Sequence, residues 1–561
     1  MAQSHIPEQA DRLNAREDRD KETARRYIRS VAAIDDGAFI DNPAMHRTDD
    51  RRPLSQESHQ ADLHRLDAGL LTKKFAEKGI SFSMVIPIAD ENNDILVEQY
   101  FKIIKAADAA ILDWQLSPAL EGNKSLLCKK LVKKIIVTEK GSRPRLILIY
   151  TAEQVNEHLS EELQNAIKED DDDLVMTELN ENFGFMFNRL KVIFFSKSVA
   201  NSGQGMGPGS FLSPDNLPDE LINQFSSLVT GLLPKVAFNA VAAIREKIDC
   251  LLSIFNKDLD AAFVHHLILA GAKANSASFL ADLFKDELCT IIVDDDEFLK
   301  SVSGQELIEW YNATDNFMKA AKLDSVVFKG LLELGYESYL DTKKNNKEFD
   351  KSPLTQNERE ELMKKIIHNT HSSLQNFSHV AALKREAFNH NRSYWVASPR
   401  LTYGTLIKRD KTPDGKPSDD YYLCIIPKCD SVRLSAETRT RFPFLRLKLS
   451  DDATKKRHLC FKASEDCTGK IATFQFSKAW NKIDFFEFTP GENSTEIRAL
   501  NTNGSSIYCF TGTNPDTPDK PIQFTWIADV KDATMSNILQ QIFQNITRMG
   551  FDDFEWLRRG R

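Results

Sequence analysis

The chain is poor in the features that mark secreted and membrane proteins. Its 561 residues include only eight cysteines, which are scattered and do not indicate a disulfide framework. No apolar run approaches the roughly 20 residues that a membrane-spanning helix needs. The first 25 residues are polar and charged, without the apolar core of a signal peptide. We therefore expect a cytoplasmic protein that does not enter a membrane.

Positive charge and the common enzyme motifs are also scarce. The net charge is −9, from 73 basic and 82 acidic residues, which argues against general affinity for nucleic acids. We find no P-loop, nucleophile elbow, metalloprotease motif or convincing helix-turn-helix. The glycine- and serine-rich stretch 201–210 is not followed by the GK[ST] of a phosphate-binding loop. We interpret this stretch and the acidic run 169–173 as solvated loops.

The length is too great for a single hydrophobic core and indicates several domains. Changes in the pattern along the chain predict five regions. They are a charged N-terminal segment (1–25) that is disordered or loosely helical, an α/β domain (26–235), a helical domain (236–390), a β-rich domain (391–530), and a C-terminal helix with a tail (531–561).

Within 26–235, strand-like and helix-like segments alternate five times. This alternation predicts a doubly wound, five-stranded parallel sheet with helices on both faces. The middle strands are nearly unbroken apolar runs, as expected for strands that are covered on both sides. The expected strands are Val31–Ile34, Ser81–Ala89, Ala109–Leu112, Leu146–Tyr150 and Val192–Phe195. The expected helices include Leu63, Leu66 and Leu70 in the first, and then span Ile95–Ala107, Ser125–Ile136, Val155–Ile167 and Pro218–Leu233.

Polar residues that suit phosphate chemistry stand at the ends of four of these strands. Asp35 and Asp36 follow the first strand and Asp113 follows the third. Thr151 follows the fourth strand, and Lys197 comes after the fifth. Because ligands bind beyond the carboxyl ends of parallel strands, these side chains can converge although they are far apart in sequence. Together they predict a site for a divalent cation and a phosphoryl group.

Each residue type has a defined task in such a site. The acid pair would ligate Mg²⁺, which takes oxygen ligands, one of the two acting through water. Asp113 would complete the metal site and act as the nucleophile, as carboxylates do in aspartyl-phosphate chemistry. The backbone carbonyl of Gln115 is a further candidate ligand. Lys197 would pair first with Asp113 and then with the phosphoryl oxygens, and Thr151 would hydrogen-bond the phosphoryl group.

In order and spacing, these motifs resemble the receiver domain of two-component signalling over residues 26–235. Phe194, three residues before the lysine, falls at the position of that family's switch aromatic. The resemblance implies a flavodoxin-like fold, Mg²⁺ as cofactor, and a histidine kinase partner that supplies the phosphoryl group from a phosphohistidine. Ser198 departs from the family, which usually has proline there, and Pro118 is displaced by one residue from the usual proline.

The whole chain is similar to the receiver-only, DtcB-like component of the Detocs antiviral phosphorelay, on its architecture and the segments DWQL and CDSVRL. This likeness implies a protein that stores phosphoryl groups or relays them, with a second receiver that carries the effector as another partner. It implies no enzyme activity beyond the receiver's own phosphorylation and dephosphorylation. Two alternatives stay open: a response regulator whose C-terminal part is an unrecognised enzyme or DNA binder, and a degenerate receiver that serves as a docking module.

Several other polar groups have simpler interpretations. Ile291–Asp296 imitates the acid pair, but no matching residues follow it, so we interpret it as a solvated helix or loop end. The basic segment Arg439–Arg446 more simply belongs to a strand whose charges face water. The spacing of Cys424, Cys429, His458, Cys460 and Cys467 does not match a zinc site. We interpret His265, His266, His368, His371 and His379 as surface or core residues rather than phosphate carriers.

Overall fold

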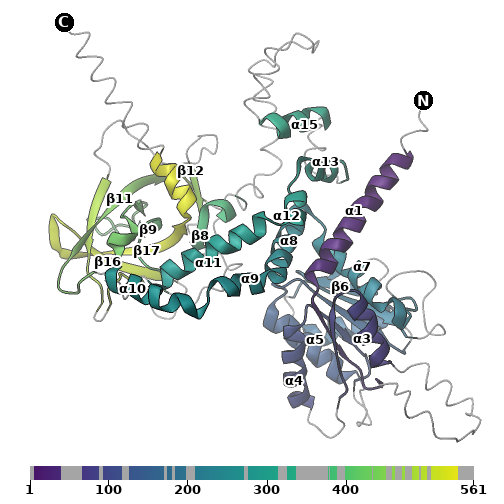
Figure 1. Cartoon of the computed structure of the whole chain (residues 1–561). Helices are drawn as coiled ribbons and strands as arrows, with labels where there is room; N and C mark the ends of the chain where they lie inside the picture. Colours follow the sequence, from purple (N-terminus) through teal and green to yellow (C-terminus); the bar gives the residue numbers. More distant parts are fainter. Residues whose placement is uncertain are drawn as a thin grey trace, which may run out of the picture. The chain divides into compact units, whose positions relative to one another are not determined.

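The structure is a computed structural model in which the chain divides into two compact units (Figure 1). The first unit comprises residues 1–254, 286–315 and 325–335, and the second comprises the remainder. The structure describes residues 6–38, 66–87, 93–116, 125–153, 155–169, 174–179, 183–197, 209–270, 276–313, 325–335, 377, 379–387, 398–432, 434–449, 458–461, 470–473, 483–491, 494–501 and 507–540.

A seven-stranded sheet forms the centre of the first unit, in the order β2-β1-β3-β4-β7-β6-β5. The neighbouring strands from β2 to β7 are parallel, as the alternating pattern predicts. Strands β6 and β5 extend the sheet beyond β7 in antiparallel pairing, so two strands are added to the expected five. The strands are β1 Ser30–Ile34, β2 Ser81–Val85, β3 Ala109–Leu112, β4 Arg145–Thr151, β5 Thr177–Glu178, β6 Gly184–Phe187 and β7 Leu190–Ser196.

Helices cover both faces of this sheet, which confirms the doubly wound arrangement (Figure 1). On one face, Leu131 and Leu163 belong to a core formed with the strands by α4, α5 and α6. On the other face, Phe75 and Phe225 belong to a second core formed by α3 and α7. The helices are α3 Ala68–Glu77, α4 Asn93–Ala106, α5 Leu126–Glu139, α6 Glu157–Lys168, the short η4 Pro214–Asn216 and α7 Leu217–Val229.

Two helix boundaries differ from the sequence prediction. The expected helix Pro218–Leu233 is interrupted, because α7 ends at Val229 and α8, Leu232–Glu246, begins after Gly231. Gly231 has a φ of +120°, which residues other than glycine rarely adopt. The chain turns at this position. The first expected helix begins only at Ala68, and Leu63 lies outside the described residues.

The charged N-terminal residues form a helix, α1 Ile6–Tyr27, that packs on the first unit. Ala24 and Tyr27 are buried in the same core as α7. The Tyr27 ring lies 5.7 Å from Phe225 and 4.6 Å from Phe238, measured between ring centroids. The carboxyl end of α1 is therefore part of the α/β domain's core, although the sequence suggests a separate, loosely ordered segment.

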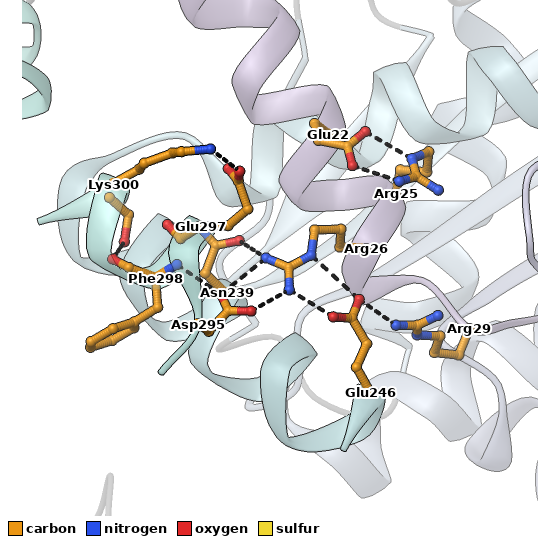
Figure 2. A network of polar contacts seen from close by, with 11 residues as sticks. Glu22, Arg25, Arg26, Arg29, Asn239, Glu246, Asp295, Glu297, Phe298 and Lys300 are labelled. Carbon is orange, nitrogen blue, oxygen red and sulfur yellow. Dashed lines mark hydrogen bonds and ion pairs between the residues drawn. The ribbon is translucent and has the colours of Figure 1, made fainter. Parts of the chain in front are cut away.

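Ion pairs of the buried Arg26 join α1 to α8 and to the start of α12, Asp296–Ser301 (Figure 2). The Arg26 guanidinium lies 2.8 Å from a Glu246 oxygen and 2.8 Å from an Asp295 oxygen. Asp295 also caps α12, because its carboxylate accepts a hydrogen bond from the Phe298 amide at 2.8 Å. The interpretation of Ile291–Asp296 as a solvated end is therefore wrong for Asp295, which is buried.

The remaining helices are shared between the two units, so the helical region 236–390 is not one compact body. Among the described residues, no helix is long and apolar enough to cross a membrane. The bounds are α9 Ile248–Ile254, η5 Lys257–Leu259, α10 Asp260–Ala270, α11 Ser276–Val293, α13 Gly304–Ala313 and α15 Ser325–Leu334.

The second unit contains a closed six-stranded antiparallel barrel, which confirms the β-rich prediction. Strands β9, β10, β11, β14, β16 and β17 pair in chain order, and β17 closes the barrel on β9. Buried aromatic residues such as Phe444, Phe486 and Phe524 pack in its core. The elements are β8 Leu383–Glu386, β9 Thr405–Arg409, β10 Tyr421–Cys424, η7 Lys428–Ser431, β11 Thr440–Leu449, β12 His458–Phe461, β13 Lys470–Thr473, β14 Ile483–Phe488, β15 Leu500–Asn501, β16 Tyr508–Asn514, β17 Thr517–Val530 and a helical stretch at 532–540.

Candidate functional site

The parallel register brings the four predicted motifs to one edge of the sheet. Strands β1, β3, β4 and β7 are consecutive neighbours, so their carboxyl ends lie side by side. The amide of Asp113 donates to the carbonyl of Ile34 at 2.9 Å, which aligns the end of β3 with the end of β1. The amide of Lys197 donates to the carbonyl of Thr151 at 2.7 Å, which aligns the end of β7 with the end of β4.

The three predicted carboxylates converge at this edge. Asp35, Asp36 and Asp113 each offer one carboxylate oxygen, and these oxygens lie within 4.8 Å of one another. Asp35 and Asp113 are buried, while Asp36 is partly exposed. Such a cluster can bind a hard divalent cation, because carboxylate oxygens are its preferred ligands.

Lys197 lies between two of these carboxylates. Its Nζ donates to Asp35 at 2.5 Å and also contacts Asp113. The lysine side chain is only 3% exposed, so it is held in one place by charge and burial together. A buried ammonium in this position can pair with the oxygens of an added phosphoryl group as well as with the acids.

The charges in the site are unbalanced, since three carboxylates face one ammonium. Burial, the largest cause, and the charge of Asp35 together raise the pKa of Asp113 to about 6, against the opposing effect of Lys197. Burial and the neighbouring Asp35 also raise the pKa of Asp36. Burial alone would lower the pKa of Lys197, but Asp113 and Asp35 raise it. A bound divalent cation would relieve this excess of negative charge, so the residues present fit Mg²⁺.

Thr151 and Gln115 are the remaining predicted residues at this edge of the sheet. The Thr151 hydroxyl is buried and accepts a hydrogen bond from the Glu153 amide at 3.1 Å, which leaves its own hydrogen to donate. The Gln115 amide donates to Asp113 at 3.2 Å, and the Gln115 side chain contacts Glu153. The role of the Gln115 carbonyl as a metal ligand stays a prediction.

Two residues next to the site were not predicted from the sequence. Trp114 is buried directly after Asp113, and the centroid of its ring lies 5.9 Å from that of Phe194. Lys129 Nζ lies 5.5 Å from the Trp114 ring and pairs with Glu162 of α6. Helix 126–139 contains four lysines, so nothing in the local sequence distinguishes Lys129 from the other three.

Comparison with known families agrees with this geometry. Residues 27–202 match the family model for the response receiver domain. These residues are a response receiver domain. No curated protein and no solved structure gives a significant match to the chain. The receiver domain's acid triad is Asp35, Asp36 and Asp113. Ser198 and Pro118, where the sequence departs from the family's usual pattern, lie outside the described residues.

The basic segment Arg439–Arg446 belongs to the barrel of the second unit. Phe442 and Phe444 are buried in the barrel, while Arg441 and Arg446 are exposed and paired with Glu487 and Asp420. The basic segment therefore faces water from a packed strand, as interpreted.

The histidine and cysteine candidates are only partly described. Cys424 is a buried barrel residue, as interpreted. His379 is buried beside Glu386, at 3.3 Å, and His265 is exposed. His368, His371 and Cys467 lie outside the described residues, as do the side chains of His266, Cys429, His458 and Cys460.

Proposed function

We propose that the receiver domain accepts a phosphoryl group on Asp113, from a phosphohistidine of a histidine kinase, in a Mg²⁺-dependent reaction. The observation that carries this proposal is the Lys197 ammonium between Asp35 and Asp113 within a triad of carboxylates. A receiver domain generally implies a histidine kinase as its partner. Such a site can bind the phosphoryl oxygens on one side and the attacking carboxylate on the other.

The transfer exchanges one bond to phosphorus for another. A carboxylate oxygen of Asp113 attacks the phosphorus, the new O–P bond forms, and the P–N bond to the imidazole breaks. The imidazole leaves with the electron pair and takes up a proton. Lys197 stays within reach of the phosphoryl oxygens, and Thr151 donates its hydroxyl hydrogen to one of them. Mg²⁺ bound by the acid triad and the Gln115 carbonyl would offset the negative charge in the site.

We further propose that the protein stores or relays this phosphoryl group, as the likeness to the receiver-only component of the Detocs antiviral phosphorelay implies. The chain then has no enzyme activity beyond the receiver's own chemistry, and a second receiver with an effector would act downstream. An effector activity of residues 216–561 would contradict the storage role and leave the phosphorylation chemistry intact.

The phosphoacceptor role can be tested without the natural kinase. Phosphoramidate, whose P–N bond mimics phosphohistidine, should add one phosphoryl group to the full chain in the presence of Mg²⁺, as measured by intact mass. Asp113→Asn should abolish this addition. Asp294→Asn is the matched control, because Asp294 is an exposed acid in the imitating segment and should leave labelling unchanged. Labelling of Asp113→Asn at the wild-type level would disprove the assignment.

A further inference from the structure

Helix α10 of the second unit is apolar around its circumference and is nevertheless exposed. After Asp260, its residues 261–270 include no Asp, Glu, Lys or Arg, and the polar side chains among them are His265 and His266. A helix of this composition is normally buried, because no face of it is suited to water. Yet Val264 is 50% exposed and Ile268 is 68% exposed. These two residues are four positions apart, so they form one apolar stripe along the helix.

The residues on either side of α10 expose further apolar groups. In η5, Leu259 is 49% exposed, and in the first half of α11 Leu283 and Phe284 are 40% and 37% exposed. The Phe284 ring stacks on Phe255 with 4.5 Å between the ring centroids, which holds the chain just before η5 against α11. None of the side chains described within Phe255–Lys285 is buried. We term Leu259, Val264, Ile268, Leu283 and Phe284 the α10–α11 surface.

Helix α7 of the first unit shows how a helix of similar length normally distributes its side chains. It buries Leu221, Phe225 and Val229 in the core, and it exposes Asn223 and Ser227 to water. In contrast, α10 has no polar face, so packing on a single element would still leave apolar side chains in water. Its composition requires neighbours on more than one side, and the described residues of the second unit do not supply them.

The lack of charge on α10 restricts what can cover it. A partner that presented charged side chains would bury them without counter-charges, because residues 261–270 offer none. The covering surface must therefore be as uncharged as α10 itself, and α10 of a second copy meets this requirement. In an antiparallel pair centred on residue 266, Val264 of each copy faces Ile268 of the other. The two Asp260 carboxylates then lie at opposite ends, roughly 15 Å apart along the helix axis, so they do not repel each other strongly.

We propose that the α10–α11 surface pairs with the same surface of a second copy, so that the protein is a dimer with two-fold symmetry. A self-complementary contact of this kind is the most common way in which identical chains associate. A stable interface uses roughly 20–30 residues on each side. Because α10 has 11 residues and α11 has 18, α10 reaches this size only together with α11. The dimer joins two receiver domains in one assembly, and it does not depend on the proposed phosphoacceptor role.

Sedimentation velocity of the full chain over a range of concentrations tests the dimer. The wild type should change from monomer to dimer as its concentration rises. Ile268→Asp places a carboxylate in the centre of the contact and should raise the dissociation constant roughly tenfold or more. Because Ile268 is largely exposed, the substitution should not disturb the fold. Leu500→Asp is the matched control, since Leu500 is 73% exposed on β15 of the same unit and should leave the dissociation constant unchanged.

A second variant tests the antiparallel register. Val264→Lys should weaken the dimer as Ile268→Asp does, because each variant alone buries two like charges. An equimolar mixture of the two variants should dimerise again, since the introduced carboxylate of one chain then faces the introduced ammonium of the other. Hydrogen exchange gives an independent location: peptides within 255–285 should exchange faster after dilution to the monomer, while β3 keeps its rate.

Several outcomes would overturn this inference. A wild type that stays monomeric at all concentrations, with fast exchange in 255–285, would assign the α10–α11 surface to a different partner. Slow exchange in 255–285 of a monomer would mean that the chain covers α10 itself. A dimer that Ile268→Asp and Val264→Lys leave intact would place the interface elsewhere. Labelling of Asp113 by phosphoramidate should be the same in all these variants, so the phosphoacceptor role stands or falls separately.

Discussion

The two ends of the receiver sheet both bury charge, but they balance it differently. At the amino end, Asp108 is 2% exposed. Its carboxylate forms ion pairs with the guanidinium groups of Arg143, at 2.9 Å, and Arg245, at 3.0 Å. Arg26 in turn lies between Glu246 and Asp295. At the carboxyl end, three carboxylates share one lysine. Side chains of opposite charge that pair with one another hold two elements in contact. A cluster with more carboxylates than cations is instead suited to bind a ligand of positive charge.

The largest effect on stability is expected at the amino end. Arg26→Met leaves the buried Asp295 without its ion-pair partner, while Glu246 keeps Arg29, and breaking a buried pair costs up to about 3–5 kcal/mol. Hydrogen exchange of β1 as a function of urea measures the loss within the first unit. Labelling of Asp113 by phosphoramidate in native conditions should persist, because Arg26 lies at the other end of β1. A loss of labelling with intact stability would break the distinction between the two ends.

The second effect concerns the single cation at the carboxyl end. Lys197→Met should slow phosphoryl acceptance by roughly a hundredfold, because the transferred group loses its only ammonium from the described site. Initial labelling rates with phosphoramidate measure the loss. Lys191→Met is the matched control on the same strand, since the Lys191 ammonium binds Gln224 at 2.7 Å and Ser227 at 2.9 Å, outside the acid site. Equal slowing by both variants would show that burial of a lysine in β7, rather than its place in the site, is what matters.

The third effect is a pH dependence of Mg²⁺ binding. The pKa of Asp113 is raised to about 6 from its ordinary value of 3.8, so the carboxyl keeps its proton to higher pH than usual. Because the cation must displace that proton, the apparent affinity should be constant above about pH 6 and fall roughly tenfold for each pH unit below it. Calorimetric titration at several pH values measures this. In Lys197→Met the break should move to higher pH, since the lysine lowers the pKa of Asp113; a break that stays in place would contradict the assigned charge balance.

The smallest effect on stability is expected from the loss of Arg25, the residue before Arg26. Arg25 pairs with Glu22 at 2.6 Å, but both side chains are nearly half exposed. Arg25→Met should therefore change the stability of β1 by less than about 1 kcal/mol. This variant is also the control for Arg26→Met. A loss as large as that of Arg26 would mean that α1 depends on its total charge rather than on the buried contacts.

The sequence was informative where a local pattern decides the structure. Apolar runs of four and five residues in β3 and β4 predicted these strands, and the parallel topology then placed Asp35, Asp113 and Lys197 together. The added strand β5 escaped prediction because its two residues, Thr177 and Glu178, are exposed and have no apolar alternation.

Contacts between distant polar residues could not be predicted. Arg26 and Asp295 are 269 residues apart, and neither residue's neighbours indicate the other. Asp295 instead imitated the acid pair, because an Asp run after an apolar stretch has the same local appearance at a helix cap and at a metal site. The two acidic runs differ only in their surroundings, because Asp35 stands at a strand end of the parallel sheet, beside the other strand ends of the site.

The long separation of Arg26 from Asp295 has a consequence during synthesis. All seven strands of the receiver sheet are complete once Ser196 has left the ribosome, whereas Asp295 emerges roughly 100 residues later. At about 5–20 residues per second, this interval lasts some 5–20 s. The nascent receiver therefore passes through a period in which its sheet can form while Arg26 still lacks Asp295 as a partner.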